Sequence, residues 1–369
     1  MSSTNLPSSM KAQVIESPNA PYKLVSLPLP QPQDPHDILL RVKAASYCHT
    51  DAVVASGALP GLPPTWPHIN CHEFTGEVVI ANSAAAALGF TPGARLAVAG
   101  HGFHCCGVCE ECVAGPEIEL GDLRGDVPGV SAYCPTSGTC GLTHPGGFAE
   151  YVVVDARQVN RIPDGLTDVE VAPLMCAGMT VFTALRKASV RPGMVVGVVG
   201  AGGGLGHLAM QFIEKIGAKP LGVESADEPL KLAREVAPEA TIVDARTTEA
   251  NEVCAKGESK KGVDVVLVLP ESQKAFDYSM AMLRTRGTCV LVSFPIAGFH
   301  ISAGDMIIRH LNILSVLGGT LSATEEMLQF AAKHGVKAKI ETYPLEKLNE
   351  LVAKYGQGAG GKYVVDMTV

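Results

Sequence analysis

Three short segments carry side chains suited to holding one metal ion. Cys48 opens the run Cys-His-Thr-Asp, His72 stands just before Glu73, and Cys176 follows much later in an apolar segment. Zinc binds thiolate sulfur and imidazole nitrogen in a tetrahedron, and three protein ligands leave a fourth position open for chemistry. Each residue alone would fit an ordinary buried cysteine or histidine. Together the patterned segments predict a catalytic zinc on Cys48, His72 and Cys176.

A second group of cysteines follows the spacing of a structural metal site. Three of them stand at i, i+3 and i+6, namely Cys106, Cys109 and Cys112. Thiolates at that spacing converge on one metal, and a closed Cys₄ zinc site needs a fourth. The candidates are Cys134, Cys140 and Cys105, of which Cys105 is disfavoured because it adjoins a ligand and would point away. A redox-active thiol cluster is the alternative, but a closed zinc that stabilises a lobe without its own core is favoured.

A glycine-rich loop further along the chain is typical of dinucleotide binding. The apolar run 194–199 ends in the loop 200–206, and a helix with one apolar face is predicted over 207–216. Glycines let the backbone approach a pyrophosphate, which the amides of the helix N-terminus then hold. The loop consists of Gly200, Ala201, Gly202, Gly203, Gly204, Leu205 and Gly206. Strict G-x-G-x-x-G does not fit, since the matching glycines are Gly200, Gly203 and Gly206, one residue longer in the first gap. A merely tight β–α turn is the alternative.

Glu224 closes the next apolar strand, predicted over 220–224. A carboxylate at that place accepts hydrogen bonds from the adenosine ribose hydroxyls and repels a 2′-phosphate. The alternative is a solvated glutamate at a strand end. With the glycine loop before it, Glu224 predicts NAD(H), and NADP(H) stays as the second choice.

The elements that position these residues fall into two kinds. Near-continuous apolar runs separated by helical segments predict a parallel sheet covered on both faces, with strands at 240–243, 263–268, 287–292 and 311–316. Earlier in the chain, strand-like runs predict a β-rich region, with strands at 11–15, 38–42, 76–80 and 95–98 and a turn that enters a strand over 146–154. The proline-rich stretch 27–32 fits neither a central strand nor a helix. The C-terminal part is expected to form helices near 324–334 and 345–355 and a strand at 362–366.

Length and composition set the general class. A chain of 369 residues is too long for one core and predicts two domains. Its net charge of -8, without basic runs, argues against nucleic acid or an anionic membrane as partner. The first ten residues are polar, unlike a signal peptide, and no apolar stretch reaches membrane-spanning length. Eleven cysteines favour metal ligands and free thiols over disulfides, and hence a cytoplasmic protein.

The whole pattern resembles the zinc-dependent alcohol dehydrogenases of the medium-chain dehydrogenase/reductase superfamily, in detail the yeast-like branch. The resemblance extends from Lys11 to Asp366. It is carried by the Cys-His-Thr-Asp run, by the segments 134–135 and 141–148, and by the glycine loop with its extra residue. It implies an α/β fold with a GroES-like catalytic domain, residues 1–177 and 320–369, whose structural-zinc lobe covers about 101–140. A Rossmann domain would occupy 178–319, and the protein would be a homodimer or homotetramer with two zinc ions per chain.

The resemblance also implies roles for single residues. Zinc lowers the pKa of the substrate hydroxyl, Thr50 takes its proton, and hydride passes between the substrate carbon and the nicotinamide. Asp51 and Glu73 would orient the ligating histidine or modulate the metal charge. His49 and Lys362, the latter in place of an arginine, would contact the pyrophosphate. For His49 an ordinary surface histidine is the alternative.

Several positions depart from the family pattern. Cys71 precedes the catalytic histidine where a glycine is usual, and Val53 stands in place of a relay histidine. Leu120 occupies the usual place of the fourth structural cysteine. The resemblance therefore makes Cys134 that ligand, with 116–133 as an exposed inserted loop that is expected to cap the substrate cleft or to have no effect.

The expected substrate is an alcohol larger than ethanol. Ala55 and the pair His101-Gly102 stand where yeast-type enzymes carry large aromatic side chains, so a roomier pocket is predicted. The predicted function is interconversion of this alcohol with its aldehyde or ketone by NAD(H). The alternatives are an NADPH-preferring carbonyl reductase or a polyol-type dehydrogenase. A non-enzymatic nucleotide-binding protein is disfavoured because the zinc ligands and Thr50 are intact.

Overall fold

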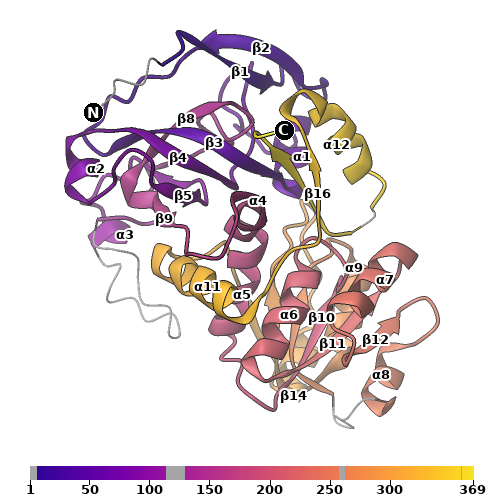
Figure 1. Cartoon of the computed structure of the whole chain (residues 1–369). Helices are drawn as coiled ribbons and strands as arrows, with labels where there is room; N and C mark the ends of the chain where they lie inside the picture. The colour runs from indigo at the N-terminus through magenta and orange to yellow at the C-terminus, as the bar shows by residue number, and fades with distance from the viewer. Residues whose placement is uncertain (1–5, 114–128, 257–261, 359) are drawn as a thin grey trace.

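The computed structural model describes residues 6–113, 129–256, 262–358 and 360–369. Two regions are each built on their own main sheet (Figure 1). The indigo and purple N-terminal strands lie in the upper half of the view, and a parallel sheet from the middle of the chain lies below them. The yellow C-terminal segment returns to the upper region.

The lower region is a six-stranded sheet in which every neighbouring pair is parallel. The strand order is β12-β11-β10-β13-β14-β15, so the chain reverses direction of travel across the sheet between β10 and β13. This is the doubly wound order in which dinucleotides bind at the switch point, beyond the carboxyl ends of the strands. The strands are β10 Val195–Val199, β11 Lys219–Glu224, β12 Thr241–Asp244, β13 Val263–Val268, β14 Leu283–Leu291 and β15 Asn312–Ser315.

Both faces of this sheet are covered, which explains the near-continuous apolar sequence of its strands. Val265 and Leu267 of β13 belong to one core, while Val266 and Val268 belong to the other. The sequence of such a strand is nearly continuous in apolar residues because both of its faces are covered. The helices of this region are α5 Ala177–Lys187, α6 Gly206–Ile216, α7 Asp227–Val236, α8 Ala250–Lys256, α9 Gln273–Met282 and α10 Ala303–Arg309. The next helix, α11 Leu321–His334, packs against α5 of this region and against β9 of the upper one.

The upper region is a seven-stranded sheet with the order β16-β17-β3-β4-β5-β9, to which β8 adds by pairing with β3. Its long central strand, β3, is buried over most of its length. The last two strands of the chain join this sheet, β17 running antiparallel to β3. The members are β3 Asp37–Tyr47, β4 Phe74–Ala81, β5 Arg95–Val98, β8 Tyr151–Asp155, β9 Val159–Arg161, β16 Ile340–Tyr343 and β17 Lys362–Asp366.

Smaller elements complete the upper region. One two-stranded sheet pairs β1 Ser9–Val14 with β2 Lys23–Pro28, and another pairs β6 His101–Phe103 with β7 Gly138–Thr139. The helices are α1 His49–Ser56, α2 Ser83–Ala87, α3 Glu110–Val113, α4 Asp168–Val171 and α12 Leu348–Tyr355, with short 3₁₀ turns η1 Ala156–Gln158, η2 Ala172–Met175 and η3 Leu345–Lys347.

The predicted fold class is confirmed: a β-rich region stands beside a doubly wound parallel sheet. The predicted inserted loop 116–133 lies mostly outside the described residues. Among the described helices, no single one has the length and apolar composition of a membrane span. Only the bent pair Asp168–Met175 and Ala177–Lys187, at 51° to each other, reaches that composition jointly.

Candidate active site

Three structural junctions bring the predicted catalytic ligands together. Cys48 lies between the end of β3 and the start of α1, His72 precedes β4, and Cys176 lies between η2 and α5. Their ligand atoms are all within 4.8 Å of one another. Residues far apart in sequence meet because β3 and β4 are hydrogen-bonded neighbours and η2 packs against both of them.

The spacing and chemistry of these three side chains fit a zinc ion. The Sγ atoms of Cys48 and Cys176 are 3.7 Å apart. Two thiolates bound at about 2.3 Å in a tetrahedron would lie about 3.8 Å apart. The pKa of the Cys48 thiol is held well below its usual value, first by the hydrogen bond from Cys176 and also by Lys362 and His72. One thiolate is therefore stabilised at this place by the protein itself, as a zinc site requires.

Asp51 is a carboxylate that contacts the backbone and the imidazole next to the ligand atoms. It is completely buried, and its carboxylate accepts backbone N–H groups from Cys48 at 2.8 Å and Cys71 at 3.0 Å. Its Oδ1 also lies 3.5 Å from Nδ1 of His72. The carboxylate therefore fixes the loop and sits beside one ring nitrogen, so the other, Nε2, is the nitrogen available to a metal.

Glu73 and Lys362 form a buried ion pair next to the ligands. Lys362 Nζ lies 2.5 Å from Glu73 Oε1 and donates to the carbonyl of Tyr47 at 3.1 Å. Burial raises the pKa of Glu73 to about 7, although the ammonium of Lys362 opposes this shift. The methylene stem of Lys362 passes close to Gly204 of the glycine loop. Lys362 thus contacts both Glu73, beside the ligand group, and the glycine loop. Its contact with a pyrophosphate stays a prediction.

The structure explains why a glycine is expected where Cys71 stands. The backbone of Cys71 has φ 84°, a left-handed conformation that glycine adopts without strain. Its Sγ lies within hydrogen-bond distance of the carbonyls of Ser46 and Glu73, at 3.4 and 3.3 Å. The thiol is thus engaged by backbone, and it does not belong to the group of ligand atoms around His72.

Thr50 and His49 lie on the first turn of α1. The hydroxyl of Thr50 is 3.8 Å from Cys48 Sγ, so it stands at the edge of the ligand group. The ring of His49 bridges two parts of the chain: Nδ1 is 3.2 Å from the Tyr355 hydroxyl and Nε2 is 3.2 Å from Oε1 of Glu271. Glu271 follows β13 of the parallel sheet, so His49 lies where the two regions meet. Both predicted roles stay predictions.

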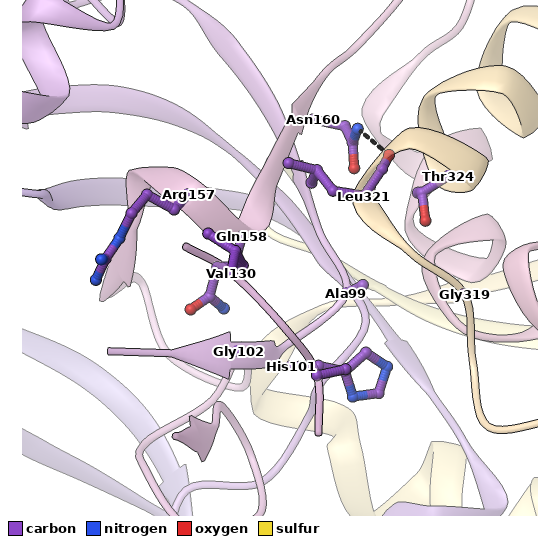
Figure 2. Close-up of a pocket in the computed structure, with 11 residues that line it drawn as sticks. Ala99, His101, Gly102, Val130, Arg157, Gln158, Asn160, Gly319, Leu321 and Thr324 are labelled. Carbon is purple, nitrogen blue, oxygen red and sulfur yellow. Dashed lines mark hydrogen bonds between the residues drawn. The ribbon is translucent and has the colours of Figure 1, made fainter. Parts of the chain in front are cut away.

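Figure 2 shows a pocket formed by residues of the upper region and of the segment around the start of α11. His101 and Gly102 of β6 line it, together with Gln158, Asn160 and the start of α11. Gly100, which precedes His101, packs directly against His72. Burial lowers the pKa of His101 to about 4, so its ring is neutral at physiological pH.

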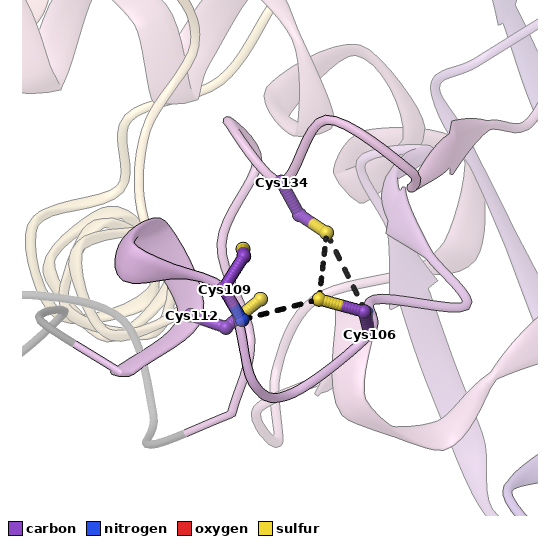
Figure 3. A group of neighbouring side chains, drawn as sticks. All are labelled: Cys106, Cys109, Cys112 and Cys134. Atoms are coloured by element: carbon purple, nitrogen blue, oxygen red, sulfur yellow. Dashed lines mark hydrogen bonds between the residues drawn. The ribbon is translucent and has the colours of Figure 1, made fainter.

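The four predicted structural cysteines face one another in the lobe around α3 (Figure 3). Cys134 Sγ lies 3.7 Å from Cys106 Sγ, the separation expected for two thiolates on one zinc. The pKa of Cys106 is lowered first by the backbone N–H of Val108 and then by that of Cys109. All four ligand atoms lie within 4.8 Å of one another. These residues fit a closed Cys₄ zinc site.

The other two candidates for the fourth ligand lie elsewhere. Cys105 is buried and its thiol lies within hydrogen-bond distance of the carbonyls of Gly102 and Ser131. Cys140 is also buried, and Gln158 donates to its sulfur at 3.7 Å. Burial raises the pKa of Cys140 to about 12, so it is a neutral thiol. The structure brings Cys134, and neither Cys105 nor Cys140, to the group formed by Cys106, Cys109 and Cys112.

The glycine loop follows β10 and leads into α6 at the switch point of the sheet. Gly200 has φ 90°, and a Cβ on Gly202 would lie 1.9 Å from the carbonyl oxygen of Pro229. A Cβ on Gly206 would likewise lie 1.9 Å from the oxygen of Gly200. The glycines required by the fold are therefore 200, 202 and 206. A Cβ on Gly203 would meet only the carbonyl oxygen of Gly200, at 3.3 Å, so the surface of Gly203 is open to a ligand.

Glu224 ends β11 beside this loop. Its Oε1 accepts the backbone N–H of Gly202 at 2.9 Å, and its Oε2 accepts that of Ser225 at 3.1 Å. Burial raises the pKa of Glu224, while these N–H groups oppose the shift. The carboxylate therefore lies against the glycine loop, and its contact with a ribose stays a prediction.

His207 on α6 ties the glycine loop to the returning C-terminal segment. Its Nδ1 donates to the Gly203 carbonyl at 2.8 Å, and its Nε2 accepts the Lys339 backbone N–H at 3.1 Å. The ring is fully buried and neutral, since burial lowers its pKa to about 4. Protonation would remove the acceptor that holds Lys339.

This histidine predicts a pH-dependent stability. An unfolded histidine binds a proton near pH 6.5, whereas folded His207 resists protonation until about pH 4. The unfolded state therefore binds more protons in this window, and stability falls as pH drops from 6.5 to 4, by about 3 kcal/mol. We expect His207→Gln to lose this part of the slope in denaturant unfolding measured across that range. The exposed-residue control His300→Gln should keep it, and equal slopes for wild type and His207→Gln would contradict the prediction.

Gln158 and Asn160 were not recognised as site residues from sequence. They follow β8 in a segment without any metal-ligand or glycine pattern. Asn160 reaches the pocket through the pairing of β9 with β5, and its short strand, Val159–Arg161, carries no local pattern that signals this.

The comparisons with known proteins cover almost the whole chain. Residues 34–164 match the family model described as alcohol dehydrogenase GroES-like domain, and residues 204–368 match the one described as zinc-binding dehydrogenase. An alcohol dehydrogenase of Geobacillus stearothermophilus is 31% identical over 349 residues, covering 95% of this chain and 96% of that protein.

Solved structures agree. The alcohol dehydrogenase of the hyperthermophilic archaeon Aeropyrum pernix superposes with a TM-score of 0.83 at 26% identity, covering 96% of this chain and 99% of that one. A zinc-binding dehydrogenase of Sinorhizobium meliloti 1021, bound to NADP, has a TM-score of 0.82 at 26% identity, covering 98% of this chain and 100% of that one.

Proposed function

Because this chain belongs to the family of zinc-binding alcohol dehydrogenases, we propose that it interconverts an alcohol larger than ethanol with its aldehyde or ketone, using NAD(H) and two zinc ions per chain. The observation that carries the proposal is the convergence of Cys48, His72 and Cys176, whose ligand atoms all lie within 4.8 Å of one another. The Cys₄ group supports the second zinc. The sheet membership of the strands supports domain bounds at 1–177 with 320–369, and 178–319.

The roles of the chain's own groups follow from their positions. Cys48, His72 and Cys176 would hold the catalytic zinc, which supplies Lewis acidity toward a substrate hydroxyl, while NAD(H) carries the hydride. Thr50, partly exposed at the edge of the ligand group, accepts the substrate proton and passes it to solvent. The buried carboxylate of Asp51 keeps the ring of His72 in place.

The test is steady-state kinetics of the zinc-loaded protein with a series of primary and secondary alcohols. We expect kcat/KM to rise with chain length beyond ethanol, because Gly102 leaves room where a large side chain is expected. Ethanol as the best substrate would contradict the size proposal. Absence of oxidation of any alcohol with either nicotinamide cofactor would contradict the function itself.

Cofactor choice gives a separate prediction. We expect kcat/KM with NAD to exceed that with NADP by roughly a hundredfold, because the Glu224 carboxylate repels a 2′-phosphate. Glu224→Gln keeps an acceptor for the Gly202 N–H but removes the charge, so it should lower this ratio. The control Glu228→Gln changes an exposed acid on α7 and should not. Equal efficiency with both cofactors in the wild type would instead favour the alternative, an NADPH-preferring reductase.

We further propose a homo-oligomer, dimer or tetramer, formed through the open edge of the parallel sheet. The edge strand β15 follows α10 in the chain, and Ile307 and Ile308 of α10 are 72% and 80% exposed. Phe294 and Ile296 nearby in sequence are exposed as well. Unpaired strand edges and exposed apolar side chains are typical of association surfaces.

The assembly is tested by light scattering. Introducing Ile307→Glu with Ile308→Glu should convert the oligomer to smaller species, because charges replace the apolar contact. Leu88→Glu, an exposed apolar residue of the other region, is the control and should leave the mass unchanged. A wild-type protein that is monomeric at assay concentrations contradicts the proposal.

The thiolate ligands support a cytoplasmic location, since they persist in a reducing compartment.

A further inference from the structure

The glycine loop presents two backbone N–H groups at the start of α6. Among the described residues, the N–H groups of Gly204 and Leu205 have no hydrogen-bond acceptor, whereas that of Gly202 donates to Glu224. Free N–H groups at the N-terminus of a helix are the donors that hold a phosphate. Whether they can do so depends on the direction in which the peptides of the loop point.

His207, in the first turn of α6, holds one of these peptides. Its Nδ1 lies 2.8 Å from the carbonyl oxygen of Gly203, which also accepts the His207 backbone N–H at 3.2 Å. The carbonyl of Gly203 and the N–H of Gly204 belong to one planar trans peptide and point in opposite directions. A carbonyl fixed toward α6 therefore keeps the Gly204 N–H directed away from the helix, beside the open surface of Gly203.

The second ring nitrogen fixes the orientation of His207. Its Nε2 lies 3.1 Å from the backbone nitrogen of Lys339, whose N–H group can only donate. Nε2 is therefore the acceptor, so the ring proton is on Nδ1 and faces the Gly203 carbonyl. The side chain is completely buried, so water does not compete for either nitrogen.

The partner segment 337–339 leads into β16 and so belongs to the part of the chain that returns to the upper region (Figure 1). Gln211, one turn further along α6, binds the same segment. Its amide donates to the Lys337 carbonyl at 2.9 Å and accepts the Lys337 N–H at 3.2 Å. The remaining hydrogen bond of Gln211 goes to the His207 carbonyl, so Gln211 holds the segment but not the loop.

Packing alone does not require an imidazole at this place. The other buried side chains of α6, among them Leu208, Ala209 and Phe212, are apolar. A buried polar group is costly to desolvate and is kept where its hydrogen bonds are made. The imidazole of His207 therefore serves its two backbone partners, one of which is a carbonyl of the glycine loop.

We propose that His207 is a positioning residue for the dinucleotide. Through its Nδ1–H it holds the Gly203 peptide so that the Gly204 N–H stays available to the pyrophosphate, while Lys339 keeps the ring in that orientation. The inference rests on the proposed use of NAD(H), and it adds a residue that acts through the glycine loop.

The experiment measures the Kd of NADH by calorimetry, without alcohol, for the zinc-loaded protein and its variants. We expect His207→Leu to raise this Kd by about tenfold, because the Gly203 carbonyl is then free to turn and the Gly204 N–H loses its fixed direction. Thermal melting of each variant checks that it is folded.

Two conservative variants separate the two hydrogen bonds of the ring. His207→Asn keeps an N–H donor close to the place of Nδ1 and should recover most of the affinity for NADH. His207→Gln places its amide close to Nε2, loses the donor to Gly203 and should bind NADH as weakly as His207→Leu. This pair decides the question if the leucine variant does not fold, and equal affinity of the two variants would contradict the proposal.

The matched control is Gln211→Leu. It removes two hydrogen bonds to the same segment from the same helix, but none to the glycine loop. We expect the Kd of NADH to stay within about twofold of wild type. Equal weakening in Gln211→Leu and His207→Leu would mean that the segment 337–339 governs the affinity and the Gly203 carbonyl does not, so the proposal would be wrong.

Steady-state kinetics separate positioning from general damage. Loss of the contact with the loop should raise KM for NAD, while KM for the alcohol and the zinc content keep their wild-type values. A folded His207→Leu protein with wild-type affinity for NADH overturns this inference and leaves alcohol oxidation intact. Absence of NADH binding by the wild type would instead sink the proposed function itself.

Discussion

Replacement of Cys48 by serine is expected to abolish alcohol oxidation, by roughly a thousandfold or more, while the protein still folds and binds NAD. The thiolate of Cys48 is a member of the ligand group, 3.7 Å from Cys176 Sγ, and an alcohol oxygen binds zinc less readily than a thiolate. Folding is preserved because Cys48 occupies the N-cap of α1, where serine is favoured. The backbone N–H that Asp51 accepts is also unchanged.

The measurements are zinc content, turnover and nucleotide binding. We expect zinc to fall from two ions per chain to one, NADH binding by calorimetry to persist, and Cys176→Ala to behave in the same way. Cys289→Ala is the control, because this buried thiol of β14 lies outside both ligand groups. Wild-type turnover in Cys48→Ser, fully loaded with cofactor, would contradict the assignment of the catalytic metal.

Replacement of Cys134 by serine is expected to have the largest effect on stability. Among its described residues the lobe has almost no apolar core, since their buried cluster consists of Cys105, Cys112, Val130 and Cys134. A bound zinc would therefore supply most of its folding energy, on the order of 10 kcal/mol. We expect Cys134→Ser to lose one zinc per chain and to lower Tm by on the order of 10 °C.

The control uses the alternative ligand from the same segment. Cys140→Ser should keep two zinc ions, since Cys140 contacts Gln158 and does not belong to the Cys₄ ligand group. Cys109→Ser should reproduce the loss seen in Cys134→Ser, because both belong to one ligand group. If Cys134→Ser retains both zinc ions while Cys140→Ser loses one, the fourth ligand has been assigned to the wrong cysteine.

Much of the local structure was predictable from sequence, because strand and helix patterns depend on near neighbours. The predicted strands 95–98, 263–268 and 362–366 coincide with β5, β13 and β17. The predicted helix at 207–216 is α6 with one residue added. The kind of metal was also predictable from sequence, because thiol sulfur and imidazole nitrogen are donor atoms that bind zinc wherever the fold places them.

Details of the glycine loop required the three-dimensional structure. The sequence pattern favours Gly200, Gly203 and Gly206, whereas the backbone demands glycine at 202 because α7 brings Pro229 against it. No local pattern reports which distant residue will approach a given Cα. Cys71 illustrates the same point, since its φ of 84° follows from the loop around Asp51 and cannot be read from its side chain.

What the sequence determined by itself is therefore the set of donor atoms, the elements that carry them and the class of chemistry. Only the tertiary structure decided which of these atoms meet. Cys48 meets Cys176, Cys134 rather than Cys140 meets Cys106, and Lys362 meets Glu73. The buried, unpaired oxygens of Gln158 and Asn160 belong to the same category. The physical reason is that donor chemistry and periodicity are properties of single residues and short segments. Contacts and unsatisfied acceptors arise instead from the packing of strands and helices that are remote in sequence.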